Sequence, residues 1–446
     1  MASNHTYNKF GPVWLAPNVT RGNAFTLLYA AFFTIGLLTF IGIGTPYVLT
    51  EILRVPTSEQ GTISGNLVLW TEIVTLIVFG PVGIAADRIG RKYVYLFGFL
   101  TMGLGYALYP TADSVTELII YRLIYAIGIA TSTGMLATIV TDYPREESRG
   151  KLVGIIGAMN GLGIVFINLA FGTLPERFVR GGMDGTQAGE MVHWLVAGLC
   201  VASTAVLWIG LKDGTPAKDE DKPSVRELAR SALLQGFENP RIALAYSAAF
   251  IARGDLVILG TFLPLWGTIA SVNNGLPTDE ATTEATLTFV LAQGAALVWT
   301  LVIVFFIDRF NRTGFLAFCM ALAAAGYLGM GFVDDPTMAN SKYFVVLLGV
   351  GQISAFFGSQ ALIGQEAPLA QRGAVIGGFN IMGALGILFC SMIGGWLFDA
   401  VAPSATFVMI GTFNGIICLL SIFVRIKSPG RMPDKQLDTQ RLGPNP

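Results

Sequence analysis

The chain has 446 residues, of which 53% are hydrophobic and only 13% are charged, against about 25% charged residues in an ordinary soluble domain. Its formal net charge is −1, and its 53 glycines are about 12% of the chain. This composition excludes a disordered or nucleic-acid-binding chain and argues against a soluble enzyme. An apolar, glycine-rich sequence is typical of transmembrane helices that pack closely.

Twelve apolar runs are each long enough to cross the hydrocarbon core as a helix of about 20 residues. They cover residues 24–48, 62–86, 93–112, 116–140, 150–173, 191–211, 242–268, 285–307, 314–334, 342–364, 374–398 and 404–425. The strands of a membrane barrel would be shorter and would alternate with polar residues. The sequence therefore predicts an all-α polytopic membrane protein with twelve transmembrane helices.

Basic residues predict the orientation of these spans. If both termini are cytoplasmic, 22 of the 28 Lys and Arg residues fall in cytoplasmic tails and loops, and four fall in outer loops. Cytoplasmic loops carry the excess of Lys and Arg in multi-pass proteins. We therefore expect cytoplasmic N and C termini and a location in the cell membrane, the inner membrane if the source is bacterial. No signal peptide is expected before the first apolar run.

The longest connection, residues 212–241, divides the spans into two sets of six. Within it, Ser224 to Glu227 reads as a capping box, and the apolar residues that follow have helical spacing, which predicts a short amphipathic helix on the cytoplasmic face. The sequence thus predicts, in chain order, a tail at 1–23, a six-helix bundle at 24–211, the linker at 212–241, a second six-helix bundle at 242–425, and a tail at 426–446.

Charged loops repeat in the two halves. After the second span come Gly83, Asp87, Arg88, Gly90, Arg91 and Lys92, and after the eighth come Asp308, Arg309 and Arg312, 221 residues later. Arg149-Gly150 and Arg372-Gly373 recur at an offset of 223 residues. Two matches at nearly one offset indicate an internal duplication.

The segment from Gly83 to Lys92 resembles the signature of the major facilitator superfamily in the loop after span two. The resemblance implies two pseudo-symmetric six-helix bundles and a charged network that latches them together on the cytoplasmic side. On physical grounds, Gly83 would let span two pack tightly, and Asp87 at a helix C-terminus would need a cationic partner, for which Arg91 is well spaced. Asp142 could join the same cluster. Alternatively, these basic residues only set the topology.

The second copy of this motif is incomplete. Val304 stands where the first copy has its initial glycine, and Thr313 replaces its last basic residue. We therefore expect the segment that contains Asp308, Arg309 and Arg312 to form the weaker latch.

Four ionisable residues lie well inside predicted spans: Glu72, Arg122, Arg253 and Asp255. Each costs about 2.5–3.5 kcal/mol at a helix centre, so such groups usually face a polar cavity or pair with one another. Arg122 resembles an arginine that many members of the superfamily carry in span four and that proton-coupled members pair with an acid in span one. Span one has no acid here, which makes Glu72 the proposed partner or proton site.

Arg253 and Asp255 are two residues apart on one helix and should point about 200° apart. One of them is expected to line the cavity and the other to pack against a neighbour, unless Gly254 unwinds the helix and brings both inward. Either residue could instead only hold span seven to its neighbours. We propose Glu72 and Asp255 as proton-coupling candidates, and Arg122 and Arg253 as substrate-binding candidates.

Uncharged polar residues inside the spans add further substrate-binding candidates: Asn160, Gln293, Gln352 and Asn380. An equally plausible role for them is hydrogen bonding between helices. The four cysteines lie in apolar runs without a paired spacing, so neither a disulfide nor a metal site is expected, and no cofactor is implied.

The sequence as a whole predicts a secondary transporter for a small organic solute, with a weak preference for an organic anion or zwitterion. Transport would proceed by alternating access and be proton-coupled, in a monomer surrounded by lipid. Two alternatives stay open, namely an uncoupled facilitator of the same fold and a non-transporting receptor or sensor. An enzyme is not expected, because the sequence contains no catalytic constellation.

Overall fold

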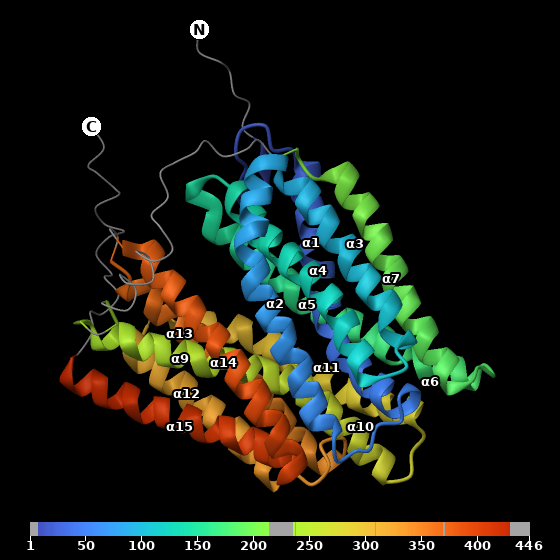
Figure 1. Ribbon diagram of the computed structural model, residues 1–446. Helices are drawn as coiled ribbons and strands as arrows, with labels where there is room; N and C mark the ends of the chain where they lie inside the picture. The colour runs from blue at the N-terminus through green and yellow to red at the C-terminus, as the bar shows by residue number, and fades with distance from the viewer. Residues whose placement is uncertain (1–7, 214–234, 237, 308, 369–370, 429–446) are drawn as a thin grey trace, which may run out of the picture.

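The computed structural model describes residues 8–213, 235–236, 238–307, 309–368 and 371–428. Helices of the first half form one bundle and helices of the second half form another (Figure 1). The N-terminal bundle contains α1 (Arg21–Tyr47, extended by η1, Val48–Ile52), α2 (Gln60–Ile89), α3 (Arg91–Leu108), α4 (Val115–Asp142), α5 (Arg149–Gly172) and α7 (Gly185–Gly210). The C-terminal bundle contains α9 (Pro240–Val257), η4 (Ile258–Phe262), α10 (Leu263–Asn273), α11 (Thr278–Ile307), α12 (Arg312–Gly329), α13 (Lys342–Glu366), α14 (Arg372–Ala400) and α15 (Pro403–Lys427).

These helices confirm the predicted fold class. In the described part of the chain, eleven helical segments are long and apolar enough to cross a membrane, and α9, η4 and α10 together make one of them. The shorter α3 lies between α2 and α4, where the third span was predicted, and brings the number of spans to twelve. It packs against α4 and α7. A short helix, α6 (Leu174–Arg180), was not predicted. The amphipathic helix expected near residue 224 falls outside the described residues.

Short elements complete the chain. The helices are linked by the 3-10 turns η2 (Tyr109–Thr111), η3 (Glu146–Ser148), η5 (Met330–Phe332) and η6 (Ala339–Ser341). Both bundles contain a π-helical turn in their first span, η1 after α1 and η4 between α9 and α10, where the helix hydrogen bonds shift by one residue. The backbone stays α-helical through Gly254, so the local unwinding considered for that residue is not observed.

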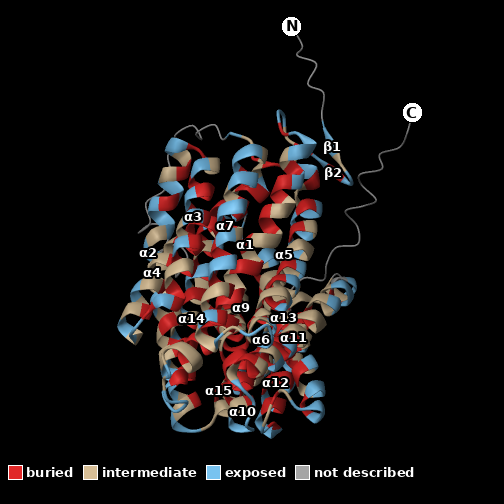
Figure 2. Cartoon of the chain, turned by 90° about the vertical axis from the view of Figure 1, so that its right-hand side faces the viewer, coloured by how far each residue is buried: buried red, intermediate tan, exposed pale blue. Residues whose placement is uncertain are grey.

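A small hairpin precedes α1. Strands β1 (Lys9–Phe10) and β2 (Val13–Trp14) pair antiparallel, and Leu15 forms a bridge with Pro144 between α4 and α5. The side chains of Val13 and Leu15 are fully buried. Part of the predicted tail at 1–23 is therefore packed against the N-terminal bundle, at the end where α1 begins (Figure 2).

We call the end where α1 begins and α15 ends the termini end, and the opposite end the far end. At the far end, α2 packs tightly on α14, since a Cβ added at Gly65 would clash with the Ser391 carbonyl. Gly172 of α5 likewise contacts Thr286 of α11. Towards the termini end, an added Cβ would meet no other atom within 4 Å at the glycines of these helices: Gly80, Gly83, Gly154, Gly157, Gly373 and Gly377.

The two bundles are therefore joined from the far end to mid-depth and separated at the termini end, which Figure 1 shows as two inclined sets of helices. The tight packing that was expected at Gly83 is absent here. The physical reason is that this glycine lies on a stretch of α2 that α14 does not contact closely.

Within the N-terminal bundle, α1 and α5 cross at a pair of glycines. A Cβ at Gly36 would lie 2.6 Å from the Gly163 carbonyl oxygen, and a Cβ at Gly163 would clash with the Phe32 carbonyl. The backbones thus approach closely only because side chains are absent at these positions.

We predict that Gly163→Ala lowers the free energy of unfolding by about 1–3 kcal/mol, because the added methyl group overpacks this crossing. Gly157→Ala on the same helix is the matched control. It meets no neighbour and gains helix propensity, so it should be neutral or stabilising by up to about 1 kcal/mol. Thermal unfolding in detergent measures both, and equal effects would contradict the packing argument.

Candidate functional site

One pair of opposite charges faces across the two bundles near mid-depth. Glu72 lies in α2 of the N-terminal bundle and Arg253 in α9 of the C-terminal bundle, and each charge acts on the other. Both side chains are half-buried. No ion pair within 4 Å joins them among the described residues, so the two groups interact at longer range. This arrangement makes the pair sensitive to how the two bundles are placed.

Gly383 of α14 leaves space through which the Arg253 side chain can extend towards α2. A Cβ at Gly383 would lie 2.6 Å from Arg253 Cγ, so the aliphatic part of the arginine fills the space of the missing side chain. In the antiparallel pair of α2 and α14, Gly65 meets Ser391. Seven residues further along, Glu72 lies level with Ala384, next to this notch. The guanidinium also sits over the ring of Phe356 in α13, 5.7 Å from its centroid.

Arg122 has different partners from those expected. Its Nε donates a hydrogen bond of 3.0 Å to Oγ1 of Thr71, and its guanidinium lies 5.0 Å from the ring centroid of Tyr125 and 6.0 Å from that of Tyr109. No ion pair with Glu72 is present in the described residues. Thr71 and Glu72 are adjacent on α2 and point about 100° apart, so Thr71 turns into the N-terminal bundle while Glu72 turns towards the other bundle.

Asp255 lies inside the C-terminal bundle and is fully buried. The Asn414 amide of α15 donates to both of its carboxyl oxygens, at 3.0 and 3.2 Å. Tyr327 of α12 donates a 2.7 Å hydrogen bond to its backbone carbonyl. Arg253 and Asp255 thus point in different directions. The position of Asp255 favours a role in holding α9 to α12 and α15 over a role on the path between the bundles.

The uncharged candidates are spread around the interface. Gln352 is 2% exposed and lies about one turn from Phe356, and its Nε2 has no hydrogen-bond partner among the described residues. Oδ1 of Asn160 is likewise unpartnered, next to Gly161, which contacts Leu297 of α11. Gln293 is half-buried on α11. Buried polar atoms without partners are unusual and mark positions where a ligand could bond.

Asn380 of α14 is exposed. It precedes Ser391 by eleven residues, which is about three helical turns, so both share the face of α14 that looks towards α2. At the level of Asn380 that face borders the separation between the bundles. Sequence reasoning missed Gly383, Phe356 and Thr71, because a glycine notch and a ring contact leave no signal in a single sequence.

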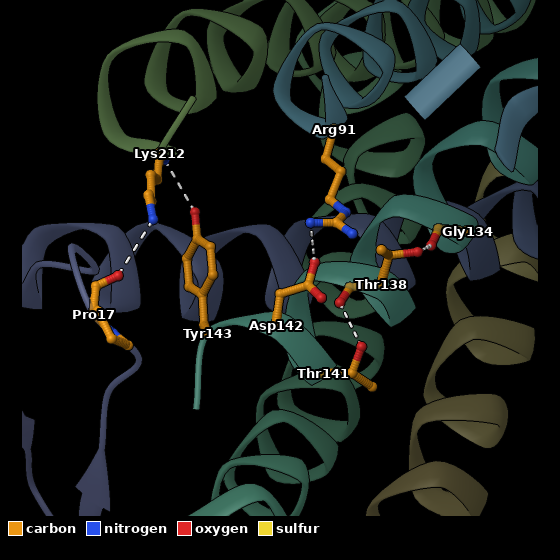
Figure 3. Close-up of polar contacts among 8 residues, drawn as sticks. All are labelled: Pro17, Arg91, Gly134, Thr138, Thr141, Asp142, Tyr143 and Lys212. Atoms are coloured by element: carbon orange, nitrogen blue, oxygen red, sulfur yellow. Dashed lines mark hydrogen bonds and ion pairs between the residues drawn. The ribbon is translucent and has the colours of Figure 1, made fainter. Parts of the chain in front are cut away.

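The charged cluster at the termini end is assembled within the N-terminal bundle. Arg91 Nη1 of α3 lies 2.7 Å from Asp142 Oδ2 at the end of α4 (Figure 3). The charges of Asp87, Arg149 and Lys212 also act on Asp142. The partner found for Arg91 is therefore Asp142 in place of the expected Asp87, because the break after α2 places Arg91 at the start of α3, beside the end of α4.

Neighbouring contacts tie the N-terminal segment to this cluster. The backbone N–H of Lys212 donates to the Tyr143 hydroxyl at 3.0 Å, and its Nζ donates to the Pro17 carbonyl at 3.4 Å (Figure 3). Burial raises the pKa of Tyr143 to about 12, so this hydroxyl is neutral at physiological pH. Lys92 Nζ lies 3.1 Å from Asp213 Oδ1.

Other motif residues have simpler positions. Gly90 has φ +98°, a conformation that favours glycine, and it separates α2 from α3. Arg88 and Arg309 are exposed, and Arg312 donates to the Ile307 carbonyl. Asp308 lies outside the described residues. The contacts given above for Arg91 and Lys92 lie on the side of the N-terminal bundle.

Two bundles of membrane-spanning helices, with a charge pair between them, define a multi-pass membrane protein of transporter architecture. The sequence profile of the Major Facilitator Superfamily matches residues 27–387 and, in a second match, 283–443. The chain belongs to this superfamily, which confirms the predicted resemblance.

The chain is similar to magnetosome protein MamH of Paramagnetospirillum magneticum, with 28% identity over 410 residues that cover 90% of this chain and 91% of MamH. Magnetosome protein MamZ of the same organism is 26% identical over 408 residues, covering 89% of this chain, which spans 62% of the length of MamZ. The crystal structure of the nucleoside transporter NupG matches with a TM-score of 0.69 at 14% identity, covering 90% of this chain and 98% of NupG. The last likeness shows the fold alone.

We predict a measurable coupling between Glu72 and Arg253. Glu72→Gln and Arg253→Gln should each lower thermal stability, because each leaves one charge half-buried without its counter-charge. The double variant should lose less than the sum, by about 0.5–1 kcal/mol. Thermal unfolding in detergent measures this cycle. In the control cycle, the effects of Glu72→Gln and Arg122→Gln should be additive. A coupling energy between these two residues would instead support the pairing of Glu72 with Arg122 that was expected from the sequence.

Gly383→Ala, on α14, should weaken the interaction between Glu72 of α2 and Arg253 of α9. The new methyl group takes the space of Arg253 Cγ and displaces the guanidinium, so the coupling energy measured by the cycle should fall towards zero. Gly377→Ala on the same helix, where no atom lies within 4 Å, should leave it unchanged. An unaltered coupling in Gly383→Ala would show that the notch does not position Arg253.

Proposed function

We propose that this protein is a secondary active transporter that moves a small organic anion or zwitterion together with a proton by alternating access. The observation that carries the proposal is the pair of Glu72 and Arg253, which come from different bundles of a molecule that is closed at the far end and open at the termini end. If the termini are cytoplasmic, this is the inward-open arrangement.

The chemistry of the pair links proton and substrate. A charged Glu72 offsets the charge of Arg253, whereas a protonated Glu72 leaves the guanidinium in an apolar region without a counter-charge. An anionic group of a substrate can then take the place of the carboxylate, with charge-assisted hydrogen bonds to the guanidinium. Proton and anion therefore bind together and leave together.

Other side chains at this level would supply orientation. Phe356 gives an apolar wall beside Arg253, and Gln352 and Asn160 carry polar atoms that have no partner in the described protein. Asn380 borders the open end, and Gln293 lies on α11 of the same interface. Arg122, held by Thr71 and two tyrosine rings, would shape the N-terminal bundle and affect the substrate through α2. Glu72 is the proton site of this proposal.

The cluster at the termini end serves the same cycle. In this proposal, Arg88, Arg91 and Lys92 of the motif contact the other bundle when the termini end closes. In the open arrangement its Arg91–Asp142 pair keeps α3 and α4 together. The alternative of an uncoupled facilitator shares this geometry but requires no titration of Glu72, and a receptor or sensor would bind the solute without moving it.

A ligand screen tests the proposal. Purified protein is mixed with carboxylates, phosphates, amino acids and neutral sugars, and the rise in melting temperature is measured between pH 5 and 8. Anions should bind more tightly as the pH falls, because protonation of Glu72 releases Arg253. Glu72→Gln should bind them tightly at every pH in this range, and Arg253→Gln should lose the binding at least tenfold.

Asp255→Asn is the matched control, since its carboxyl group is buried away from the interface, and it should keep the pH dependence of the unaltered protein. An anion whose affinity still rises at low pH in Glu72→Gln would remove the coupling role of this residue. Binding that survives Arg253→Gln would place the site elsewhere.

A further inference from the structure

At the far end, a carboxylate of one bundle caps a helix of the other. Asp399, in the last turn of α14, accepts hydrogen bonds from two backbone N–H groups in the first turn of α2. Its Oδ1 lies 2.8 Å from the Gly61 nitrogen and its Oδ2 lies 2.6 Å from the Thr62 nitrogen. These contacts join residues more than 330 positions apart in sequence.

The first turn of α2 has no cap of its own. The residue before the helix, Glu59, makes no side-chain capping hydrogen bond. The first N–H groups of a helix have no partner within the helix, and its N-terminus attracts negative charge. Other helices of the N-terminal bundle, such as α4 and α7, are capped from within, by Ser114 and Asp184.

Asp399 is also poorly placed for its own helix, since a carboxylate at a helix C-terminus is disfavoured by the helix dipole. Its contact with the N-terminus of α2 provides the favourable electrostatic interaction that its own helix does not provide. Close packing makes the contact possible, because a Cβ at Gly395 would lie 2.6 Å from the Gly61 carbonyl oxygen. Both bundles therefore gain from the contact, and both lose it when the far end opens.

We propose that Asp399 is the lock of the far end: it caps α2 only in the closed arrangement, and so sets the balance between the two arrangements of the alternating cycle. The inference rests on the alternating access of the proposed function, but it concerns neither the substrate nor the proton. Removing the cap should favour molecules that are open at the far end by about tenfold.

Thiol labelling tests the lock without any substrate. Ser391 lies on α14 about two helical turns before Asp399. It is fully buried, and its backbone carbonyl faces Gly65 of α2. In a Ser391→Cys variant that keeps only the native Cys319, N-ethylmaleimide labels the introduced thiol when the far end opens. It labels Cys319, which is buried inside the C-terminal bundle, only when that bundle unfolds. Mass spectrometry follows both sites in one sample.

Asp399→Ala should speed labelling at position 391 about tenfold and leave Cys319 unchanged. Asp184→Ala, which removes a cap within one bundle, should change neither rate. Thr62→Pro removes one of the two N–H donors in a first helical turn that tolerates proline, and it should act in the same direction if Asp399→Ala folds poorly. Equal rates at position 391 in the original and both lock variants would overturn the proposal, as would a parallel rise at Cys319.

Discussion

The arrangement of this protein depends on the cost of a charge in an apolar surrounding. A single ionic side chain near the middle of a membrane helix costs about 2.5–3.5 kcal/mol, and the cost falls when an opposite charge or a polar atom lies near. Here the opposite charges of Glu72 and Arg253 belong to different bundles. Any movement of one bundle against the other, and any change in the protonation of Glu72, therefore changes the energy of the pair.

Glycines decide where the two bundles approach. At the far end Gly61, Gly65 and Gly395 bring α2 and α14 into backbone contact, and at mid-depth Gly383 makes room for Arg253. Backbones approach this closely only where side chains are small or absent. The contact of Asp399 with the start of α2 adds a polar fastening to this surface. The glycine content seen in the composition thus has a defined function in the structure.

Relatives of this chain place these features in the Major Facilitator Superfamily without fixing the solute. MamH, a magnetosome protein, aligns with this chain over nearly the whole length of both proteins, while NupG shares the fold at 14% identity. Function within such a fold depends on the groups that line the path. In our proposal, the preference for an anion rests on Arg253 and on the unpartnered polar atoms of Gln352 and Asn160.

The sequence by itself determined the class of protein, the twelve spans and the division into two halves, because length and hydropathy are local properties that a bilayer reads directly. It also identified Glu72, Arg122, Arg253 and Asp255 as costly residues that need partners. Only the tertiary structure identified their partners. It pairs Arg122 with Thr71, Arg91 with Asp142, and Asp255 with Asn414. A pairing depends on how neighbouring helices are rotated and spaced, and contacts between segments more than 100 residues apart, such as Asp399 with α2, leave no periodic signal in one sequence.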